Sequence, residues 1–385
     1  MVIGLGAHGS ATAYQLARRG QRVLGIEAFA RAHDLGSSGG LTRIIRLAYF
    51  ERPDYVPMLR AAWELWPQVE AAASAQLMLQ TGGLYCGRVG SAVLDGSLRS
   101  AREHGLPHEL LDAAETRRRF PALRLDDDMH ALHEPLAGML FPERCIEAHL
   151  GLAERHGAEL RFGERVVGWQ RDGSGISVTT DRATYVADRL VLAAGAWLAK
   201  LLPDVDLPLL VERNPLFWFE PATDAGLLAP DRLPVWIVEL DAQHAFYGFP
   251  DLPGQGFKAA RHHGGLPTDP DTLDRQVHES DEAPVRRFLE RYLPAGNGRR
   301  LRGQVCMYTN TPAFNFILDF HPADDRVLVV SPCSGHGFKF SSVIGAIAAE
   351  LVTEGTSRFE IGFMSMARFA QVGRPRNDGR GVSPT

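Results

Sequence analysis

The stretch that decides the fold is Val2–Glu27, VIGLGAHGSATAYQLARRGQRVLGIE. Val2-Ile3 end an apolar strand, and three glycines follow in the spacing G-x-G-x-x-G. Alanine and leucine then recur at helical intervals until Gly20, and a second apolar run, Val23–Ile26, ends at Glu27. Apolar strand, glycine-rich turn, helix and second strand together predict a β-α-β unit.

Each glycine of this turn has a separate role if the unit binds a dinucleotide. Gly4 permits the tight turn, Gly6 lets the backbone approach a pyrophosphate, and Gly9 lets the helix pack closely on the strand. The helix N-terminus offers unpaired N–H groups to the phosphates. Glu27 follows Gly4 by 23 residues, where its carboxylate can accept the ribose hydroxyls. A glycine-rich turn alone is weak evidence, but the complete unit predicts a dinucleotide, without separating NAD from FAD.

Composition excludes several classes of protein. A chain of 385 residues favours two domains, and 45 % hydrophobic with 23 % charged residues is ordinary for a soluble globular protein. The net charge of −5 gives no reason to expect nucleic acid or an anionic membrane, and the longest apolar run, Leu190–Ala199, is too short for a bilayer. The four cysteines show no metal-ligand spacing, and no signal peptide precedes Val2, so we predict a cytoplasmic protein without a metal site.

Only Met1, Val2 and Ile3 precede Gly4, whereas a central parallel strand usually has about five or six residues. This favours a native start upstream of Met1 or a clipped chain, and either would weaken the first strand.

Segments typical of a nucleotide-binding domain recur along the chain. Leu190–Ala194 is a buried apolar strand that ends in a turn at Gly195, and Val327–Val330 is a second, followed by the turn Gly335-His336-Gly337 and a helix at Ser341–Leu351. The segments between them include aromatic, alternating runs, which predict antiparallel strands. Such interruption favours a FAD protein over a simple NAD dehydrogenase.

We therefore predict an α/β fold, with a Rossmann-type FAD-binding domain that is discontinuous in sequence and an antiparallel β-rich substrate domain. The FAD-binding domain comprises residues 1–78, 140–205 and 313–370, and the substrate domain comprises residues 79–139 and 206–312. Residues 371–385 are predicted to form a disordered tail. Two charged helices are predicted within Asp269–Leu293.

Several later stretches resemble one family. They are Gly303–Pro312 (GQVCMYTNTP), Ser334–Ser342 (SGHGFKFSS), Thr42–Arg46 (TRIIR), Phe246–Pro250 (FYGFP) and Gly256–Lys258 (GFK). From Val2 to about Phe363 the chain is similar to the monomeric sarcosine oxidase and N-methyltryptophan oxidase family. The resemblance implies covalently bound FAD and oxidation of a secondary amino acid to an imine, with O₂ reduced to H₂O₂.

Cys306 is the residue that this resemblance assigns to covalent attachment, through a thioether to the flavin. An inert buried thiol is the alternative. Relatives carry histidines just before the Thr-Arg pair, where this chain has Ser38-Gly39-Gly40-Leu41. If such a histidine assists attachment, flavinylation is expected to be slow or incomplete.

Arg46 and Lys339 are the two cations expected at the substrate carboxylate. A guanidinium can bind a carboxylate with two hydrogen bonds. Lys339 begins a helix, where its charge opposes the helix dipole, and an anionic flavin edge or a substrate carboxylate would offset that cost. Arg43 would lie about one turn from Arg46 if the segment were helical, and the family places it against the flavin ring. Solvated arginines are the alternative.

Lys258 lies in an apolar run, which is unusual for a lysine without a partner. The resemblance implies that it faces the flavin through water and activates O₂, because a fixed ammonium stabilises the charge of superoxide. Tyr247, His262 and Tyr308 are expected around the substrate, with structural hydrogen bonds as an equal alternative. The expected cofactor-binding residues are Gly4, Gly6, Gly9, Glu27, Thr42, Arg43, Gly195, Cys306, Gly335, Gly337 and Lys339.

The predicted function is oxidation of a small secondary amino acid such as sarcosine by a monomer, with no nucleic-acid or membrane partner. Pipecolate or another cyclic imino acid, N-methyltryptophan and fructosyl-amino acids are alternative substrates. The aromatic side chains of Phe217, Trp218, Phe219 and Trp236 either enlarge the pocket or only pack beside it. A flavin-binding subunit without turnover is the alternative from another class, and the charges of Lys258, Arg46 and Lys339 argue against it.

Overall fold

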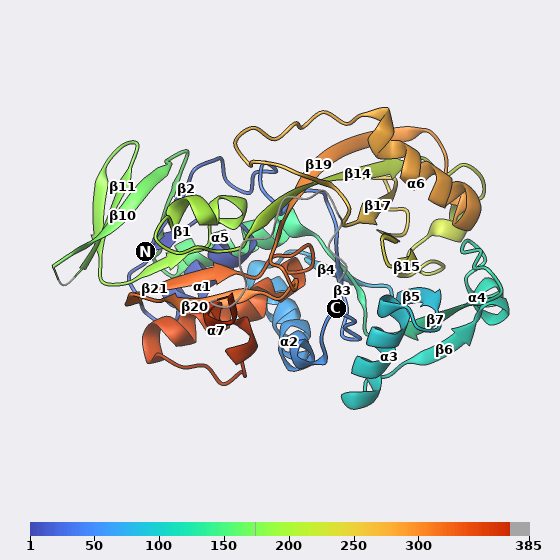
Figure 1. The fold of residues 1–385 in the computed structure, drawn as a ribbon, viewed down its shortest axis with the longest axis horizontal. Helices are drawn as coiled ribbons and strands as arrows, with labels where there is room; N and C mark the ends of the chain where they lie inside the picture. Colours follow the sequence, from blue (N-terminus) through green and yellow to red (C-terminus); the bar gives the residue numbers. More distant parts are fainter. Residues whose placement is uncertain (174, 370–385) are drawn as a thin grey trace.

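The computed structural model describes residues 1–173 and 175–369, so the predicted tail at 371–385 lies outside the described residues. Two large sheets lie side by side in the molecule, one of six strands and one of nine (Figure 1). Two three-stranded sheets complete the β-structure of the described residues. Among these residues, no helix is long and apolar enough to cross a lipid bilayer.

The six-stranded sheet contains the β-α-β unit. Its strands are parallel except for the antiparallel pair β20 and β21. In spatial order they are β20 (Ile317–His321), β21 (Asp324–Ser331), β13 (Leu190–Leu192), β1 (Val2–Ile3), β2 (Leu24–Glu27) and β9 (Glu159–Phe162). Although β1 has only two residues, it pairs with β2 on one side and β13 on the other, so it occupies the centre of the sheet.

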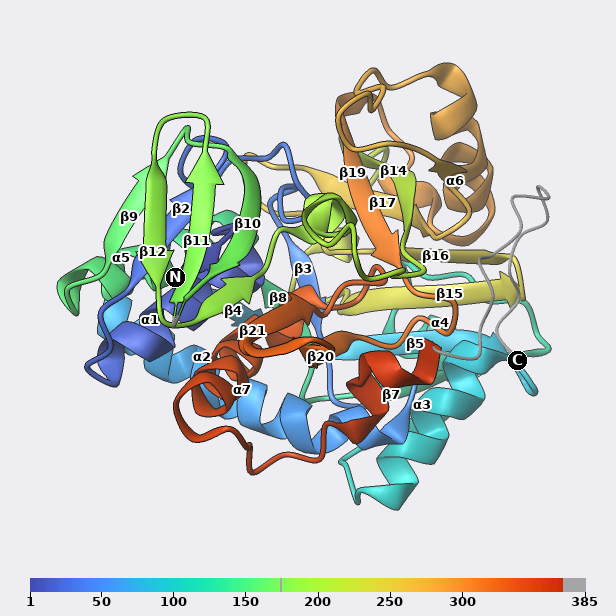
Figure 2. The ribbon, with the colours of Figure 1, turned by 60° about the vertical axis from the view of Figure 1, so that its left-hand side comes forward.

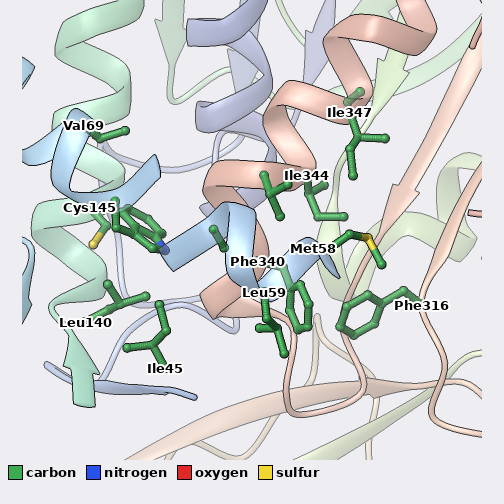
Figure 3. Packing of buried hydrophobic residues seen from close by; sticks show 14 of the residues in the cluster. Ile45, Met58, Leu59, Val69, Leu140, Cys145, Phe316, Phe340, Ile344 and Ile347 are labelled. Atoms are coloured by element: carbon green, nitrogen blue, oxygen red, sulfur yellow. The ribbon is translucent and has the colours of Figure 1, made fainter. Parts of the chain in front are cut away.

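Helices cover this sheet. Helix α1 (Ala7–Arg18) packs between α5 (Pro142–Arg155) and α7 (Ser341–Glu354), and α2 (Val56–Ala73) contacts both of these neighbours. The buried residues of α2 recur at helical spacing. In Figure 3 they meet apolar side chains from α5, α7 and β3, so segments distant in sequence share one core.

The glycine turn between β1 and α1 leaves no room for side chains at two positions. Gly4 has φ of +84°, and a Cβ there would lie 2.6 Å from the carbonyl oxygen of Ala193. A Cβ at Gly9 would lie 1.7 Å from the carbonyl oxygen of Gly4. The helix can approach the strand this closely only because both residues are glycine.

The nine-stranded sheet is antiparallel except for the parallel pair β5 and β15. Its strands are β5 (Gly83–Arg88), β6 (Glu109–Asp112), β7 (Met129–Glu134), β14 (Leu210–Phe219), β15 (Val235–Asp241), β16 (His244–Gly248), β17 (Phe257–His262), β18 (Leu266–Pro267) and β19 (Arg300–Asn310). The accompanying helices are α3 (Ala92–Glu103), α4 (Ala113–Arg119) and α6 (Glu279–Tyr292).

Four aromatic residues of the second sheet, Phe217, Trp218, Phe219 and Trp236, pack rather than enlarge the pocket. Phe217, Phe219 and Trp236 are fully buried in an apolar cluster that also contains Phe288 of α6. Trp218 is buried on the other side, beside Cys306. None of the four predicted residues lines the cavity described below.

The remaining strands form two small sheets. One comprises β10 (Val166–Asp172), β11 (Gly175–Thr180) and β12 (Thr184–Ala187), and it stands at the edge of the molecule in Figure 2. The other comprises β3 (Arg43–Ile45), β8 (Gly138–Leu140) and β4 (Met78–Gln80). The helical alternative for Arg43–Arg46 is therefore wrong, because this segment pairs as a strand with β8.

The prediction of two helices within Asp269–Leu293 is also wrong, since only α6 forms there. Asp269 and Asp274 each accept a hydrogen bond from the backbone N–H two residues further along. Such local turns compete with helix formation.

The predicted α/β fold is confirmed, with a Rossmann-type sheet built from distant segments and a separate, mainly antiparallel sheet. The division into two domains and its boundaries stay a prediction.

Candidate active site

A cavity of about 470 Å³ brings residues of both large sheets together. One part is lined by the glycine turn and the end of β2, and another by side chains from β16, β17 and β19. The predicted site residues that line it are Gly4, Gly6, Glu27, Arg43, Arg46, Gly195, Tyr247, His262, Cys306, Tyr308, Gly335, Gly337 and Lys339. Gly9, Thr42 and Lys258 do not line it.

The glycine turn suits a dinucleotide. The carboxylate of Glu27 accepts hydrogen bonds from the backbone N–H groups of Leu5 (2.8 Å) and Phe29 (3.1 Å), which hold it at the cavity wall. A Cβ at Gly6 would meet no protein atom closer than 3.7 Å, so space is left in front of this backbone. His8 Nδ1 and Ser37 Oγ, both on lining residues, have no hydrogen-bond partner among the described residues. The residues present therefore fit a bound FAD.

Cys306 and Arg43 meet in the cavity although 263 residues separate them. Cys306 lies on β19, and its Sγ is 3.7 Å from Nη2 of Arg43. The guanidinium also donates to backbone carbonyls of Ser37, Gly39 and Thr42. Arg43 thus binds the loop before β3 and places positive charge beside the thiol.

Lys258 on β17 is 2 % exposed, and its Nζ lies beneath the segment Gly40–Thr42 rather than in the cavity. Nζ donates to the carbonyl oxygens of Gly40 (2.5 Å) and Thr42 (2.9 Å) and to Thr42 Oγ1 (3.2 Å). Three acceptors match the three donors of an ammonium, whereas a neutral amine has only two. Burial, reinforced by the charge of Arg43, lowers the pKa of Lys258.

Arg46 and Lys339 form a buried cationic cluster with one carboxylate, Glu51. Arg46 follows β3, is 2 % exposed and donates to both carboxylate oxygens of Glu51 at 2.6 Å. Burial alone would raise the pKa of Glu51, but the surrounding groups, Arg46 foremost, together hold that pKa below its ordinary value. Burial lowers the pKa of Lys339, and Arg46 lowers it further. Two cations and one anion leave an excess positive charge while Lys339 is protonated.

Tyr247, His262 and Tyr308 form a third group around the cavity. The hydroxyl of Tyr308 donates to that of Tyr247 at 3.4 Å, and the His262 ring lies 5.9 Å from each tyrosine ring. Burial lowers the pKa of His262, as does the neighbouring His263, and burial raises the pKa of Tyr308. Both shifts favour the neutral forms of His262 and Tyr308 near pH 7.

The sequence did not indicate three residues of this site, which are Glu51, His336 and Tyr49. Glu51 pairs with Arg46, and His336 lines the cavity between two predicted glycines. Nδ1 of His336 shares a short hydrogen bond with the hydroxyl of Tyr49, and burial lowers the pKa of His336 to about 3. The quoted SGHGFKF stretch contained His336, but nothing in its pattern distinguished the ring from a turn residue.

Comparisons with known proteins agree with this geometry. Residues 1–351 match the family described as FAD dependent oxidoreductase. The chain is 43 % identical to the monomeric sarcosine oxidase of Streptomyces avermitilis over 373 residues, which cover 96 % of this chain and 97 % of the relative. It is 34 % identical to the N-methyl-L-tryptophan oxidase of Yersinia pestis over 371 residues, covering 96 % and 98 % of the two chains.

Solved structures give the same result. The structure of NikD, an amino acid oxidase of nikkomycin biosynthesis, superimposes with a TM-score of 0.83 and 27 % identity, covering 94 % of this chain and 96 % of that one. Glycine oxidase from Geobacillus kaustophilus superimposes with a TM-score of 0.82, covering 95 % and 97 %; at 19 % identity it supports the fold alone.

The glycine turn, the fold and the family match together define a FAD-dependent oxidoreductase. Within that class, the chain belongs to the family of monomeric sarcosine oxidases and N-methyl-L-tryptophan oxidases, as its sequence motifs predicted.

Proposed function

We propose that this enzyme oxidises a small secondary amino acid, such as sarcosine, to an imine and reduces O₂ to H₂O₂. The observation that carries the proposal is the buried cluster of Arg46, Lys339 and Glu51 in the cavity wall. With Lys339 protonated, its excess positive charge suits one carboxylate, because a buried charge is favourable only when it is paired. Similarity to enzymes named for sarcosine and N-methyl-L-tryptophan also supports it.

Each group of side chains has a part in this proposal. Arg46 and Lys339 bind the substrate carboxylate, and Tyr247, His262 and Tyr308 surround the amine. FAD, when bound, supplies the redox chemistry by accepting the electrons of the substrate C–H bond.

The residues proposed to hold FAD lie in several parts of the chain. The glycine turn of Gly4, Gly6 and Gly9 with Glu27 would hold the dinucleotide part of FAD. The residues proposed at the ring system are Thr42, Arg43, Gly195, Cys306, Gly335, Gly337 and Lys339.

The size of the substrate is the open part of the proposal. Ile44, Ile237 and Phe249 contribute apolar surface to the cavity, which suits an N-methyl group. Pipecolate, N-methyltryptophan and fructosyl-amino acids are the alternatives within the class. A flavin-binding subunit without turnover is the alternative outside it. We further propose a monomer, because related enzymes are named monomeric sarcosine oxidases, and the cytoplasmic location stays a prediction.

A panel of amines tests the proposal. Purified protein with its bound FAD is mixed with sarcosine, N-methyltryptophan, pipecolate or a fructosyl-amino acid, and peroxide is measured. Sarcosine should give the highest kcat/KM. Preference for another amine would reassign the substrate, and absence of peroxide with all four, in protein that holds FAD, would favour the subunit without turnover.

Covalent attachment through Cys306 gives a separate prediction. The intact mass should exceed that of the bare chain by one FAD, and acid-denatured protein should stay yellow. Cys306→Ala should lose this added mass while it still binds FAD without a covalent bond, because the glycine turn and Glu27 are unchanged. Cys333→Ala is a matched control, since Cys333 also lines the cavity. A wild-type mass equal to the bare chain would contradict the assignment.

A further inference from the structure

Glu134 is a buried carboxylate outside the set of residues that line the cavity. It ends β7, opposite Gly83 in the register of the second sheet, and its exposed fraction is 0 %. A carboxylate is rarely retained at such a position unless it is fully hydrogen-bonded. Its partners therefore indicate what it is for.

Those partners lie next to Arg46. Oε1 of Glu134 accepts hydrogen bonds from the backbone N–H groups of Leu47 and Ala48, both at 2.9 Å. Oε2 accepts a third from the hydroxyl of Tyr85 at 2.6 Å. Strand β3 ends at Ile45, so the carboxylate binds the backbone of the second and third residues beyond that end. The segment just after Arg46 is thus bound to the second sheet.

Two connections lead from Glu134 to the guanidinium of Arg46. The first runs through the backbone of Ala48. Its N–H donates to Glu134, and its carbonyl oxygen accepts a hydrogen bond from Arg46 Nη1 at 3.1 Å. The second runs through Tyr85. Its hydroxyl donates to Glu134, and the centre of its ring lies 5.7 Å from Arg46 Cζ. The position of the guanidinium therefore depends on a carboxylate that does not itself face the cavity.

We infer that Glu134 is a positioning residue for the substrate carboxylate and acts through Arg46; this inference rests on the proposed function. Two-point binding of a carboxylate demands that the guanidinium be held in one orientation. What Glu134 must supply in this role is a hydrogen-bond acceptor for the two N–H groups, more than a negative charge. Burial raises the pKa of Glu134 to about 7, so the group is not firmly ionised at neutral pH. Glutamine would keep an oxygen for the two N–H groups.

The test separates carboxylate binding from amine binding with two fragments of sarcosine, acetate and dimethylamine, titrated by calorimetry into the FAD-loaded enzyme. Glu134→Ala should weaken acetate binding by on the order of tenfold to a hundredfold, the range expected when a binding group is misplaced. Dimethylamine binding should change by less than about threefold, about 0.6 kcal/mol, and the KM for sarcosine should rise more than kcat falls. Glu134→Gln should restore acetate binding to near the wild-type value.

Glu239 offers a matched control. It is a buried glutamate on β15, 7 % exposed, whose carboxylate accepts from the backbone N–H groups of Ala92 (3.3 Å) and Val93 (2.6 Å) at the start of α3. Glu239→Ala removes two similar hydrogen bonds away from Arg46. It should lower the unfolding temperature without a selective loss of acetate binding.

Several outcomes would overturn the inference. They are wild-type acetate affinity in Glu134→Ala, an equal loss for acetate and dimethylamine, a loss in Glu134→Gln as large as in Glu134→Ala, or the same selective loss in Glu239→Ala. If Glu134→Ala does not fold, Tyr85→Phe takes its place. It removes one hydrogen bond and keeps the ring, so acetate binding should weaken by about twofold to fivefold, and unchanged binding overturns the inference. Wild-type acetate affinity in Arg46→Ala would instead overturn the proposed carboxylate site itself.

Discussion

Replacing Lys258 by methionine should slow the reaction of the reduced enzyme with O₂ by roughly a thousandfold, which corresponds to about 4 kcal/mol. The physical reason is that O₂ becomes negatively charged as it takes up the first electron, and a fixed ammonium in a dry site stabilises that charge. Reduction by the substrate should slow much less, since the substrate carboxylate is proposed to bind at Arg46 and Lys339 instead. Anaerobic stopped-flow measures reduction, and mixing the reduced enzyme with O₂ measures the second half of the cycle.

The contacts of Lys258 demand a control for geometry. Methionine leaves the carbonyls of Gly40 and Thr42 without their donor, so part of any loss could come from movement of this segment. Thr42→Val keeps the ammonium and both carbonyl bonds and removes only the contact to Oγ1. It should leave the O₂ reaction within about tenfold of wild type, because the ammonium charge that stabilises reduced O₂ is retained. Collapse of reduction with a normal O₂ reaction would contradict the role of Lys258.

The pH dependence of the O₂ reaction follows from the same group. Burial lowers the pKa of Lys258, and the stabilising form is the protonated one. The wild-type rate with O₂ should therefore fall as pH rises through a range below the ordinary lysine value of about 10.4, and Lys258→Met should lose this fall.

Replacing Arg46 by alanine should weaken substrate binding by at least about 1.5–3 kcal/mol, the range for hydrogen bonds to charged groups. The structure adds a reason for a larger loss. Glu51 would lose its partner, and as long as it is ionised its charge would repel the substrate carboxylate. The Kd of sarcosine should rise, while that of dimethylamine should change little.

The contribution of Glu51 can be separated by a double variant. Arg46→Ala with Glu51→Gln should bind sarcosine more tightly than Arg46→Ala alone, because the repulsive charge is gone. Lys339→Met, which keeps the apolar stem, should also weaken sarcosine binding selectively. Equal losses for sarcosine and dimethylamine in these variants would show that the two cations do not bind the carboxylate.

The parts of the fold that could be predicted are those written in short-range patterns. Gly4, Gly9 and Glu27 fall within one stretch, and their spacing dictates the turn they form. A helix was wrongly predicted where one segment fits two local patterns, a surface helix and a series of turns. The segment after Asp269 is rich in charge, as a surface helix is, but its aspartates bond to the nearby backbone instead.

The sequence could indicate which residues belong to the site, but not how their side chains are placed relative to one another. The family motifs indicated Cys306, Arg43 and Lys258, and two of these line the cavity. The orientation of Lys258 toward backbone carbonyls could not be predicted, because it depends on how β17 meets the loop before β3. Glu134 carries no motif, since its hydrogen-bond partners lie 49 to 87 residues away in the sequence.

The order of strands in the six-stranded sheet has a consequence for how the protein matures. Val2 pairs with Val191, and Leu190 pairs with Val327, so the centre of the sheet joins the first, middle and last parts of the chain. A ribosome must release nearly all of these segments before the sheet can close, and pairing across such distances is slow. The glycine turn is synthesised first, yet Gly4 acquires its neighbour Ala193 only when β13 arrives. We therefore expect cofactor capture to be a late, post-translational event, and a chain cut before β21 should remain without FAD.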